Sequence, residues 1–245
     1  MADFDEPVEQ SAAPAALPPL YDFHTHTLHS DGALVPVELL RRVIVAGYDG
    51  LGLSDHVGLG GMERLVEEVA ADCALARERW DFPCFAGVEL THVPASAIAE
   101  LAARARRCGA AYVVVHGETL VEPVEPGTNL AAVSCPHVDL LAHPGLLTEE
   151  EAALAAENEV FLEISAKPGH CLANGRVAQM ARRTGAKPLV GSDTHEPRHL
   201  LSRELVRNVL LGAGLTAEEI HRVVYEHPRE LLDRCRVRLA EGVAR

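Results

Sequence analysis

The 245-residue sequence predicts a single α/β domain built as a closed barrel of seven parallel strands. Short apolar runs alternate with longer segments of helical periodicity, which is typical of a parallel sheet. Histidines and carboxylates recur just past the ends of the predicted strands. Only a closed barrel brings the carboxyl ends of all strands around one mouth, so the sequence favours a barrel over an open, doubly wound sheet.

Each strand is expected at a short apolar run. The runs are 21–23, 50–54, 83–89, 112–115, 140–142, 160–164 and 188–190. Helices are expected between them at 35–46, 63–79, 95–108, 148–156, 176–184, 200–211 and 217–236. Gly47, Gly109 and Gly185 directly follow three of these helices, where glycine is a frequent helix end. Residues 117–139 contain prolines and little periodicity, which predicts a loop or short turns beside the mouth.

Composition excludes several classes of protein. The net charge of −14 repels phosphate backbones, so nucleic acid is not an expected partner. No apolar run approaches the length of a membrane span, so no membrane association is expected either.

Six cysteines without a disulfide-like spacing predict a reduced, cytoplasmic setting. Residues 1–19 are acidic, then rich in Ala and Pro, and are interpreted as a flexible lead-in to one domain at 20–245; the sequence leaves the oligomeric state open.

The recurring histidines and carboxylates carry the functional signal. They are His24, His26, Asp31, Asp55, His56, Glu89, His116, His143, Asp193 and His195. Such side chains are costly to crowd together unless something pairs with them, and bound cations would do so. His24 and His26 are two residues apart, so they point the same way from a strand and can hold one ion.

The motifs Asp22-Phe-His24-Thr-His26-Thr27, Ser54-Asp55-His56, Gly87-Val-Glu89, His143-Pro-Gly145 and Gly191-Ser-Asp193-Thr-His195 resemble, in this order, those of the PHP (polymerase and histidinol phosphatase) family. The resemblance extends over about residues 22–196. It implies a distorted (β/α)7 barrel, similar to a TIM barrel, with two or three divalent metal ions at the C-terminal rim of the strands. It also implies metal-dependent phosphoester hydrolysis.

The resemblance also implies a distribution of ligands. The first ion would be held by His24, His26, Glu89 and Asp193, and the second by Glu89, His116 and His143. The third would be held by Asp31, His56 and His195, with His29 as the rival of Asp31. Imidazole with carboxylate suits Zn, Mn or Fe without choosing among them.

The expected chemistry is attack on phosphorus by a hydroxide that bridges the first two ions. The catalytic residues are then His24, His26, Glu89, Asp193 and His195. Asp55 is either a partner that orients an imidazole or a buried structural carboxylate.

Other polar residues near the predicted mouth are candidates for binding a small phosphorylated substrate. They are Lys167, His170, Arg176 and Arg198, with Asn174 and Glu118 as further candidates. Lys167 follows the one strand that supplies no ligand in this scheme, and its ammonium could hold a phosphate as a point charge. His92 is a candidate general acid.

The leading function is hydrolysis of a phosphate ester of a small metabolite, such as histidinol phosphate or a nucleotide. One alternative is an amidohydrolase that attacks C–N or C–O centres. Amidohydrolases usually add a carboxylated lysine from a middle strand, and no lysine ends the predicted fourth strand here. A second alternative is a non-catalytic PHP module, although such modules tend to lose ligands.

Overall fold

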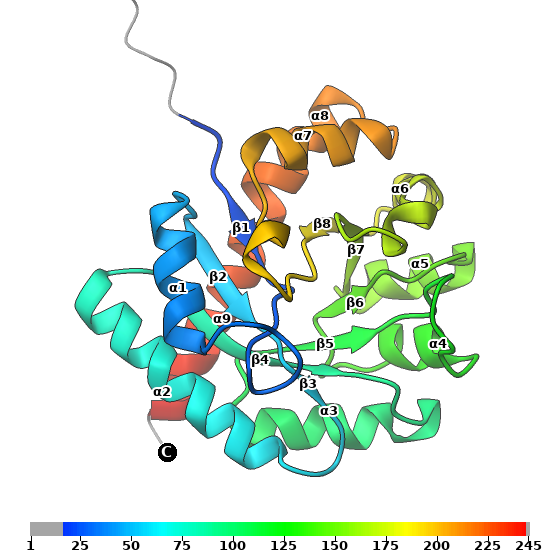
Figure 1. Ribbon diagram of the computed structural model, residues 1–245. Coiled ribbons are helices and arrows are strands. Elements are labelled where there is room, and N and C mark those ends of the chain that lie inside the picture. The colour runs from blue at the N-terminus through cyan, green and yellow to red at the C-terminus, as the bar shows by residue number, and fades with distance from the viewer. Residues whose placement is uncertain (1–16, 244–245) are drawn as a thin grey trace, which may run out of the picture.

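The computed structural model describes residues 17–243, and the lead-in expected at 1–19 therefore lies almost wholly outside the described residues. Seven parallel strands follow one another around a barrel in the order β1-β2-β4-β5-β6-β7-β8, as predicted, and the short β3 pairs with β4 (Figure 1). The strands are β1 (Tyr21–Asp22), β2 (Gly50–Leu53), β3 (His56–Val57), β4 (Cys84–Leu90), β5 (Tyr112–His116), β6 (Leu140–Ala142), β7 (Phe161–Ser165) and β8 (Pro188–Gly191).

Helices cover the outside of the barrel. They are α1 (Pro36–Val45), α2 (Met62–Trp80), α3 (Ile98–Arg107), α4 (Thr128–Val133), α5 (Glu149–Glu157), α6 (Asn174–Thr184), α7 (Arg203–Gly212), α8 (Ala217–His221) and α9 (His227–Val243). The capping box predicted at the start of α5 is present, with Thr148 and Glu151 bonding to each other's backbone amides. No helix within residues 17–243 is both long enough and apolar enough to cross a membrane.

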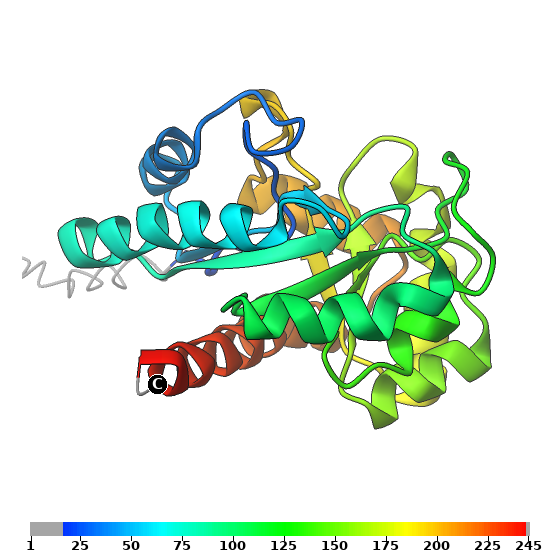
Figure 2. The same cartoon turned by 90° about the horizontal axis from the view of Figure 1, so that it is seen from below.

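The barrel interior is filled by aromatic side chains. The rings of Phe23 and Tyr112 meet edge to face with centroids 5.8 Å apart. Gly52 and Gly87 leave room for Tyr112, because a Cβ atom on either would lie within 2.4 Å of that side chain. Leu231 and Leu232 of α9 belong to the same cluster, so α9 closes the amino end of the barrel, as its long course beside the sheet in Figure 2 suggests. The other end remains available for the polar residues.

The barrel closes between its first and last strands through few contacts. One parallel bridge joins Thr25 to Thr194, where the amide of His26 donates to the carbonyl of Thr194 at 2.9 Å. The buried carboxylate of Asp22 supports this junction by accepting from the amides of His24 and Ser192. The residues next to the bridge are predicted metal ligands, so closure of the barrel and assembly of the site coincide.

Three local predictions need correction. The segment 117–139 is not only loop, because α4 forms within it and buries Ala132 and Val133 against the core. The helix predicted at 200–211 begins at Arg203, where the Ser202 side chain caps it. The helix predicted at 217–236 consists of α8, a turn of π-helix at Arg222–Glu226 and then α9.

Candidate metal centre

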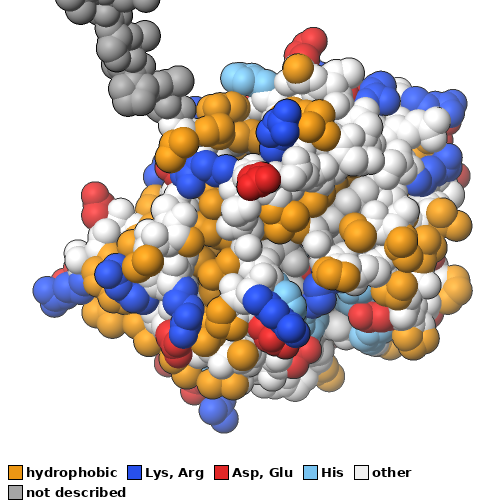
Figure 3. Space-filling view, turned by 45° about the horizontal axis from the view of Figure 1, so that its top comes forward, with side chains coloured by type: hydrophobic (Ala, Val, Ile, Leu, Met, Phe, Trp, Pro, Cys, Tyr) orange, Lys and Arg blue, Asp and Glu red, His pale blue; other side chains and the backbone are white. Residues whose placement is uncertain are grey.

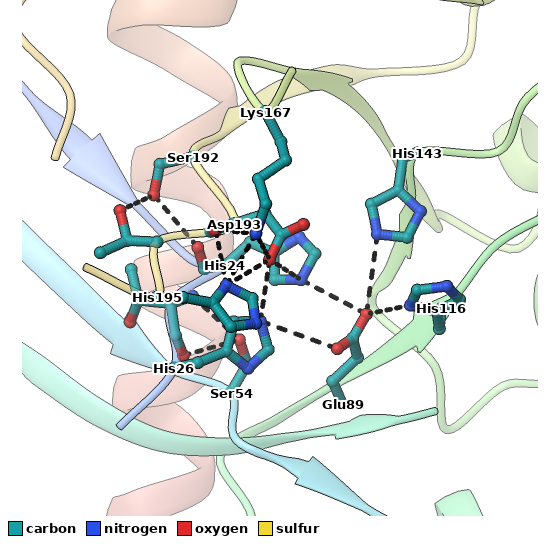
Figure 4. A network of polar contacts seen from close by, with 12 residues as sticks. His24, His26, Ser54, Glu89, His116, His143, Lys167, Ser192, Asp193 and His195 are labelled. Carbon is teal, nitrogen blue, oxygen red and sulfur yellow. Dashed lines mark hydrogen bonds and ion pairs between the residues drawn. The ribbon is translucent and has the colours of Figure 1, made fainter. Parts of the chain in front are cut away.

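The predicted ligands meet at the carboxyl ends of the strands. Five groups of side chains have ligand atoms within 4.8 Å of one another, and three of these consist wholly of predicted ligands. These three groups are His26–Asp31–His56–His195, His24–His26–Asp193 and His24–Glu89–His143. Figure 4 shows Glu89 pointing between His24, His116 and His143, and Figure 3 shows histidine side chains reaching the surface beside charged ones. The ligands predicted from the strand ends therefore lie together in one cluster.

The distances within the cluster fit shared cations. His24 Nε2 lies 3.3 Å from Glu89 Oε1, and His26 Nε2 lies 3.3 Å from Asp193 Oδ1. Asp31 Oδ1 lies 3.4 Å from His56 Nε2 and 3.1 Å from His195 Nε2. Two atoms bound at about 2.0–2.1 Å to a tetrahedral Zn²⁺ lie about 3.3–3.4 Å apart. Charge-assisted hydrogen bonds are shorter, about 2.7–2.9 Å, so most of these spacings suit ligands better than ion pairs.

Several of these atoms also make no hydrogen bond. His24 Nε2, both ring nitrogens of His26 and of His143, and Asp193 Oδ1 are buried without a hydrogen bond in the described part of the chain. A buried polar atom without a partner costs about 1–3 kcal/mol, and here the costs fall on one small volume. Imidazole nitrogens and carboxylate oxygens are the donors that Zn, Mn and Fe accept, so the residues present fit divalent cations.

The protonation states of four ligands fit, whereas, against the effect of burial, Glu89 and Asp193 raise the pKa of His56, His116 and His195, whose ring protons a bound cation would displace. Burial lowers the pKa of His26 to about 4, and burial together with His116 and His24 lowers the pKa of His143 well below its usual value. Burial alone would raise the pKa of Glu89 and of Asp193, but the neighbouring His24 and other imidazoles hold both well below their usual values. Neutral imidazole and ionised carboxylate are the forms that bind metal.

Glu163 is a site residue that the sequence reasoning missed. It lies in β7, fully buried, with Oε2 2.5 Å from His24 Nδ1. Burial lowers the pKa of His24, but Glu163, Glu89 and Asp193 more than compensate and raise it well above its usual value. With a cation bound in place of the Nε2 proton, Glu163 would still accept the Nδ1 proton and so orient the Nε2 lone pair towards the ion. The sequence feature that could have indicated Glu163 is a carboxylate within the otherwise apolar run Phe161-Leu-Glu-Ile164.

Gly191 makes room for this carboxylate. A Cβ atom at Gly191 would lie 2.6 Å from Glu163 Oε2. The glycine of the Gly191-Ser-Asp193 motif is therefore required by the side chain on the neighbouring strand.

Asp55 does not orient an imidazole; it fixes the loop that carries Asp31. Its carboxylate accepts from the amide and hydroxyl of Thr27 and from the hydroxyl of Ser30. The loop brings Asp31 to His56 and His195. His29, the rival at this position, instead points to Glu68 at 3.3 Å.

The predicted substrate-binding residues fall into two sets. Lys167 Nζ lies 2.8 Å from His195 Nδ1 and 3.3 Å from Asp193 Oδ1, inside the cluster. His170 Nε2 lies 3.4 Å from Asp193 Oδ2, and its Nδ1 bonds to Thr119. These two residues are therefore well placed to contact a substrate.

The other two candidates point elsewhere. Arg176 donates to the carbonyl of Leu147, and the exposed Arg198 pairs with Glu196. None of their hydrogen bonds or ion pairs within residues 17–243 reaches the cluster, so the structure gives no support to a substrate role for either. Asn174 bonds to the backbone of Ser165 and is structural.

A second missed residue is Glu122, between β5 and α4. Its Oε2 lies 3.0 Å from His116 Nε2 and 3.2 Å from His92 Nε2. Glu118, a candidate from the sequence, accepts from the amides of Gly127 and Asn129 and so closes this loop on itself. Sequence spacing could not place Glu122, because its position depends on how the loop folds back.

Solved structures of other proteins share this barrel fold. An amidohydrolase crystal structure aligns over 94% of this chain and 79% of its own, with a TM-score of 0.56 and 14% identity. A metal-dependent tyrosine phosphatase from the study of YwqE of Bacillus subtilis and CpsB of Streptococcus pneumoniae aligns over 90% and 94%, with a TM-score of 0.52 and 16% identity. At such identities the likeness is one of fold.

The chain belongs to the same family as the uncharacterized protein MJ1295 of Methanocaldococcus jannaschii. The two are 43% identical over 215 residues, which is 87% of this chain and 99% of MJ1295. No family model matches the chain.

Proposed function

We propose that this protein is a metal-dependent hydrolase of the PHP type that cleaves the phosphate ester of a small metabolite. The observation that carries the proposal is the buried convergence of unpartnered imidazole and carboxylate atoms at ligand spacing. His24, His26, Glu89, Asp193 and His195, with Asp31, His56, His116 and His143, would hold two or three divalent cations. Zn, Mn and Fe all suit this set of donors.

The charges in the site make cations necessary for a phosphate substrate. Asp31, Glu89, Glu163 and Asp193 contribute four carboxylates, whereas Lys167 is the nearest ammonium. A phosphate dianion would be repelled by this arrangement alone. Bound divalent cations would reverse the local charge, lower the pKa of a water molecule towards 7 and stabilise charge on the phosphate.

The remaining roles belong to the chain's own side chains. Lys167 would hold a phosphate oxygen as a point charge, because its ammonium already faces Asp193 and His195. His170, held by Thr119, would contact the same substrate from the other side of Asp193. Histidinol phosphate and nucleotides are candidate substrates, and neither nucleic acid nor a membrane is a proposed partner. All six cysteines are free, which supports the proposed cytoplasmic setting.

Phosphate release from metal-reconstituted protein tests the proposal. The panel contains p-nitrophenyl phosphate, bis(p-nitrophenyl) phosphate, histidinol phosphate and nucleoside monophosphates. We expect activity with Zn²⁺, Mn²⁺ or Fe²⁺ that is lost after treatment with EDTA and returns with the metal. His143→Gln should lose more than about 100-fold in kcat/KM, since removing even an indirect partner of a ligand costs about 10–100-fold. His137→Gln, an exposed histidine elsewhere, is the matched control. Full activity after removal of all metal would refute the proposal.

Amidohydrolysis is the second candidate, because an amidohydrolase is among the structures with the same fold. The carboxyl ends of the middle strands argue against it, because Glu89 and His116 lie at the ends of β4 and β5 and neither end carries a lysine. Turnover of N-acyl amino acids, with no turnover of any phosphate ester, would favour amidohydrolysis.

A further inference from the structure

Besides the three inner groups and a group of His143, His170 and Asp193, a further group of metal-type side chains lies at the rim. Its members are His92, just after β4, His116, at the end of β5, and Glu122, in the loop that follows β5. Their ligand atoms lie within 4.8 Å of one another, as in the inner groups. His92 and Glu122 are not among the nine ligands that the sequence motifs indicate.

The two ring nitrogens of His116 face different groups, one the inner cluster and the other this rim group. Its Nδ1 lies 3.3 Å from Glu89 Oε1, whereas its Nε2 lies 3.0 Å from Glu122 Oε2. Although close to Glu122, the buried Nε2 is not aligned with it for a hydrogen bond. Glu89, His24 and His143 form an inner group without His116. With Nδ1 directed at Glu89, the Nε2 of His116 faces the rim, and a cation bound there would take His116 from the inner set and leave His24, Glu89 and His143 to the inner ion.

The loop is built so that Glu122 stays at this position. Glu118 bonds to two amides at its far end, and the Asn129 side chain donates to the carbonyl of Pro144. Gly145 permits the contact, because a Cβ atom there would lie 1.9 Å from the carbonyl oxygen of Glu118. The residues on both sides of Glu122 in this loop are thus fixed, and the loop is held against the His143-Pro-Gly145 segment.

His92 has an unfavourable backbone conformation for a histidine in a loop. Its φ is +52°, and within residues 17–243 the other non-glycine residues with positive φ are His143, Asp193, Asp81 and Glu159. Asp81 and Glu159 follow the ends of α2 and α5, where this conformation is common. His143 and Asp193 belong to the inner cluster. Left-handed non-glycine residues cost about 1–3 kcal/mol and gather at functional sites, so His92 shares this property with the site.

We propose that His92, His116 and Glu122 bind an additional divalent cation of the zinc class, distinct from the cations of the inner cluster. Two histidines and one glutamate make a donor set that leaves one coordination position open, as in catalytic zinc sites. The His92 and Glu122 side chains are 40% and 37% exposed, so this cation exchanges with solvent more readily than the inner ones. It lies where an incoming anion first meets the site, and its open position accepts an oxygen of that anion. The inference does not depend on which bond the enzyme hydrolyses.

Zinc stoichiometry tests this proposal without any substrate. The full-length protein is dialysed against buffers of defined free Zn²⁺, and bound zinc per chain is measured by mass spectrometry. Wild type is compared with Glu122→Gln and His92→Gln, which keep size and polarity. Glu125→Gln is the matched control, because Glu125 lies on the same loop and bonds to the backbone of Ala95 instead.

We expect both rim variants to bind one zinc fewer per chain at intermediate free Zn²⁺, while the control matches wild type. His143→Gln should lose a different zinc, so the double variant with Glu122→Gln should lose one more than either alone. Equal stoichiometry and affinity in wild type and both rim variants would overturn the proposal. So would a double variant that loses no more than a single one, since rim and inner residues would then share one cation. Thermal denaturation checks that each variant is folded. If Glu122→Gln is not, His92→Gln, at an exposed position, still tests the proposal.

Discussion

Replacing Glu163 by Gln should weaken cation binding although Glu163 is not a ligand. The substitution keeps the shape that Gly191 accommodates, but it removes the charge 2.5 Å from His24 Nδ1. Hydrogen bonds to charged groups contribute about 1.5–3 kcal/mol. Gln still accepts a neutral hydrogen bond, so part of this remains. A loss of about 10–100-fold in affinity, or about 1.4–2.8 kcal/mol, follows.

Competition with a chromogenic chelator measures this affinity directly. Glu67→Gln, on the exposed face of α2, removes the same charge without touching the site and should match wild type. Loss of affinity in both variants would point to net charge rather than to His24. Wild-type affinity in Glu163→Gln would refute the reasoning, because orientation of His24 by Glu163 would then contribute nothing.

Three further predictions follow from single contacts. Asp55→Asn should release the loop that carries Asp31 and remove one bound cation at low metal concentration, measured as zinc per chain, without unfolding the protein. Gly191→Ala should lower the free energy of unfolding by about 1–3 kcal/mol, measured by urea denaturation, because the added methyl group overpacks a buried site; an unchanged midpoint would contradict this. The hydrogen bond from Arg182 lowers the pKa of Glu219 to about 2. The stability from this pair is therefore complete above about pH 4.5 and lost as the pH falls towards 2. Glu219→Gln should melt below wild type at pH 7 and approach it in acid.

The sequence predicted the barrel because its apolar runs and helix ends are local features. The inner ligands could be predicted for a related reason, since most of them lie at or just past the end of a strand and the carboxyl ends of parallel strands share one rim. His24 and His26 illustrate this: their spacing and their position after β1 suffice to place both rings on one side.

The residues that were missed depend on contacts between distant segments. Glu163 touches His24 across 139 residues, and nothing near either residue in the sequence indicates the pairing. Glu122 reaches His116 and His92 only because Glu118, Asn129 and Gly145 fold its loop back over the rim. Asp55 lies beside a ligand in sequence, yet its bonds go to Thr27 and Ser30 in another loop.

The single bridge between Thr25 and Thr194 gives the cations a second importance. Beside it stand His24 and His26 on one edge of the sheet, and Asp193 and His195 on the other. A cation held by His26 and Asp193 therefore spans the seam where the cylinder of strands is joined. Opening the seam would separate the ligands of that ion, so its binding free energy would add to the stability of the closed barrel. Binding of that ion and closure of the barrel would then be one equilibrium.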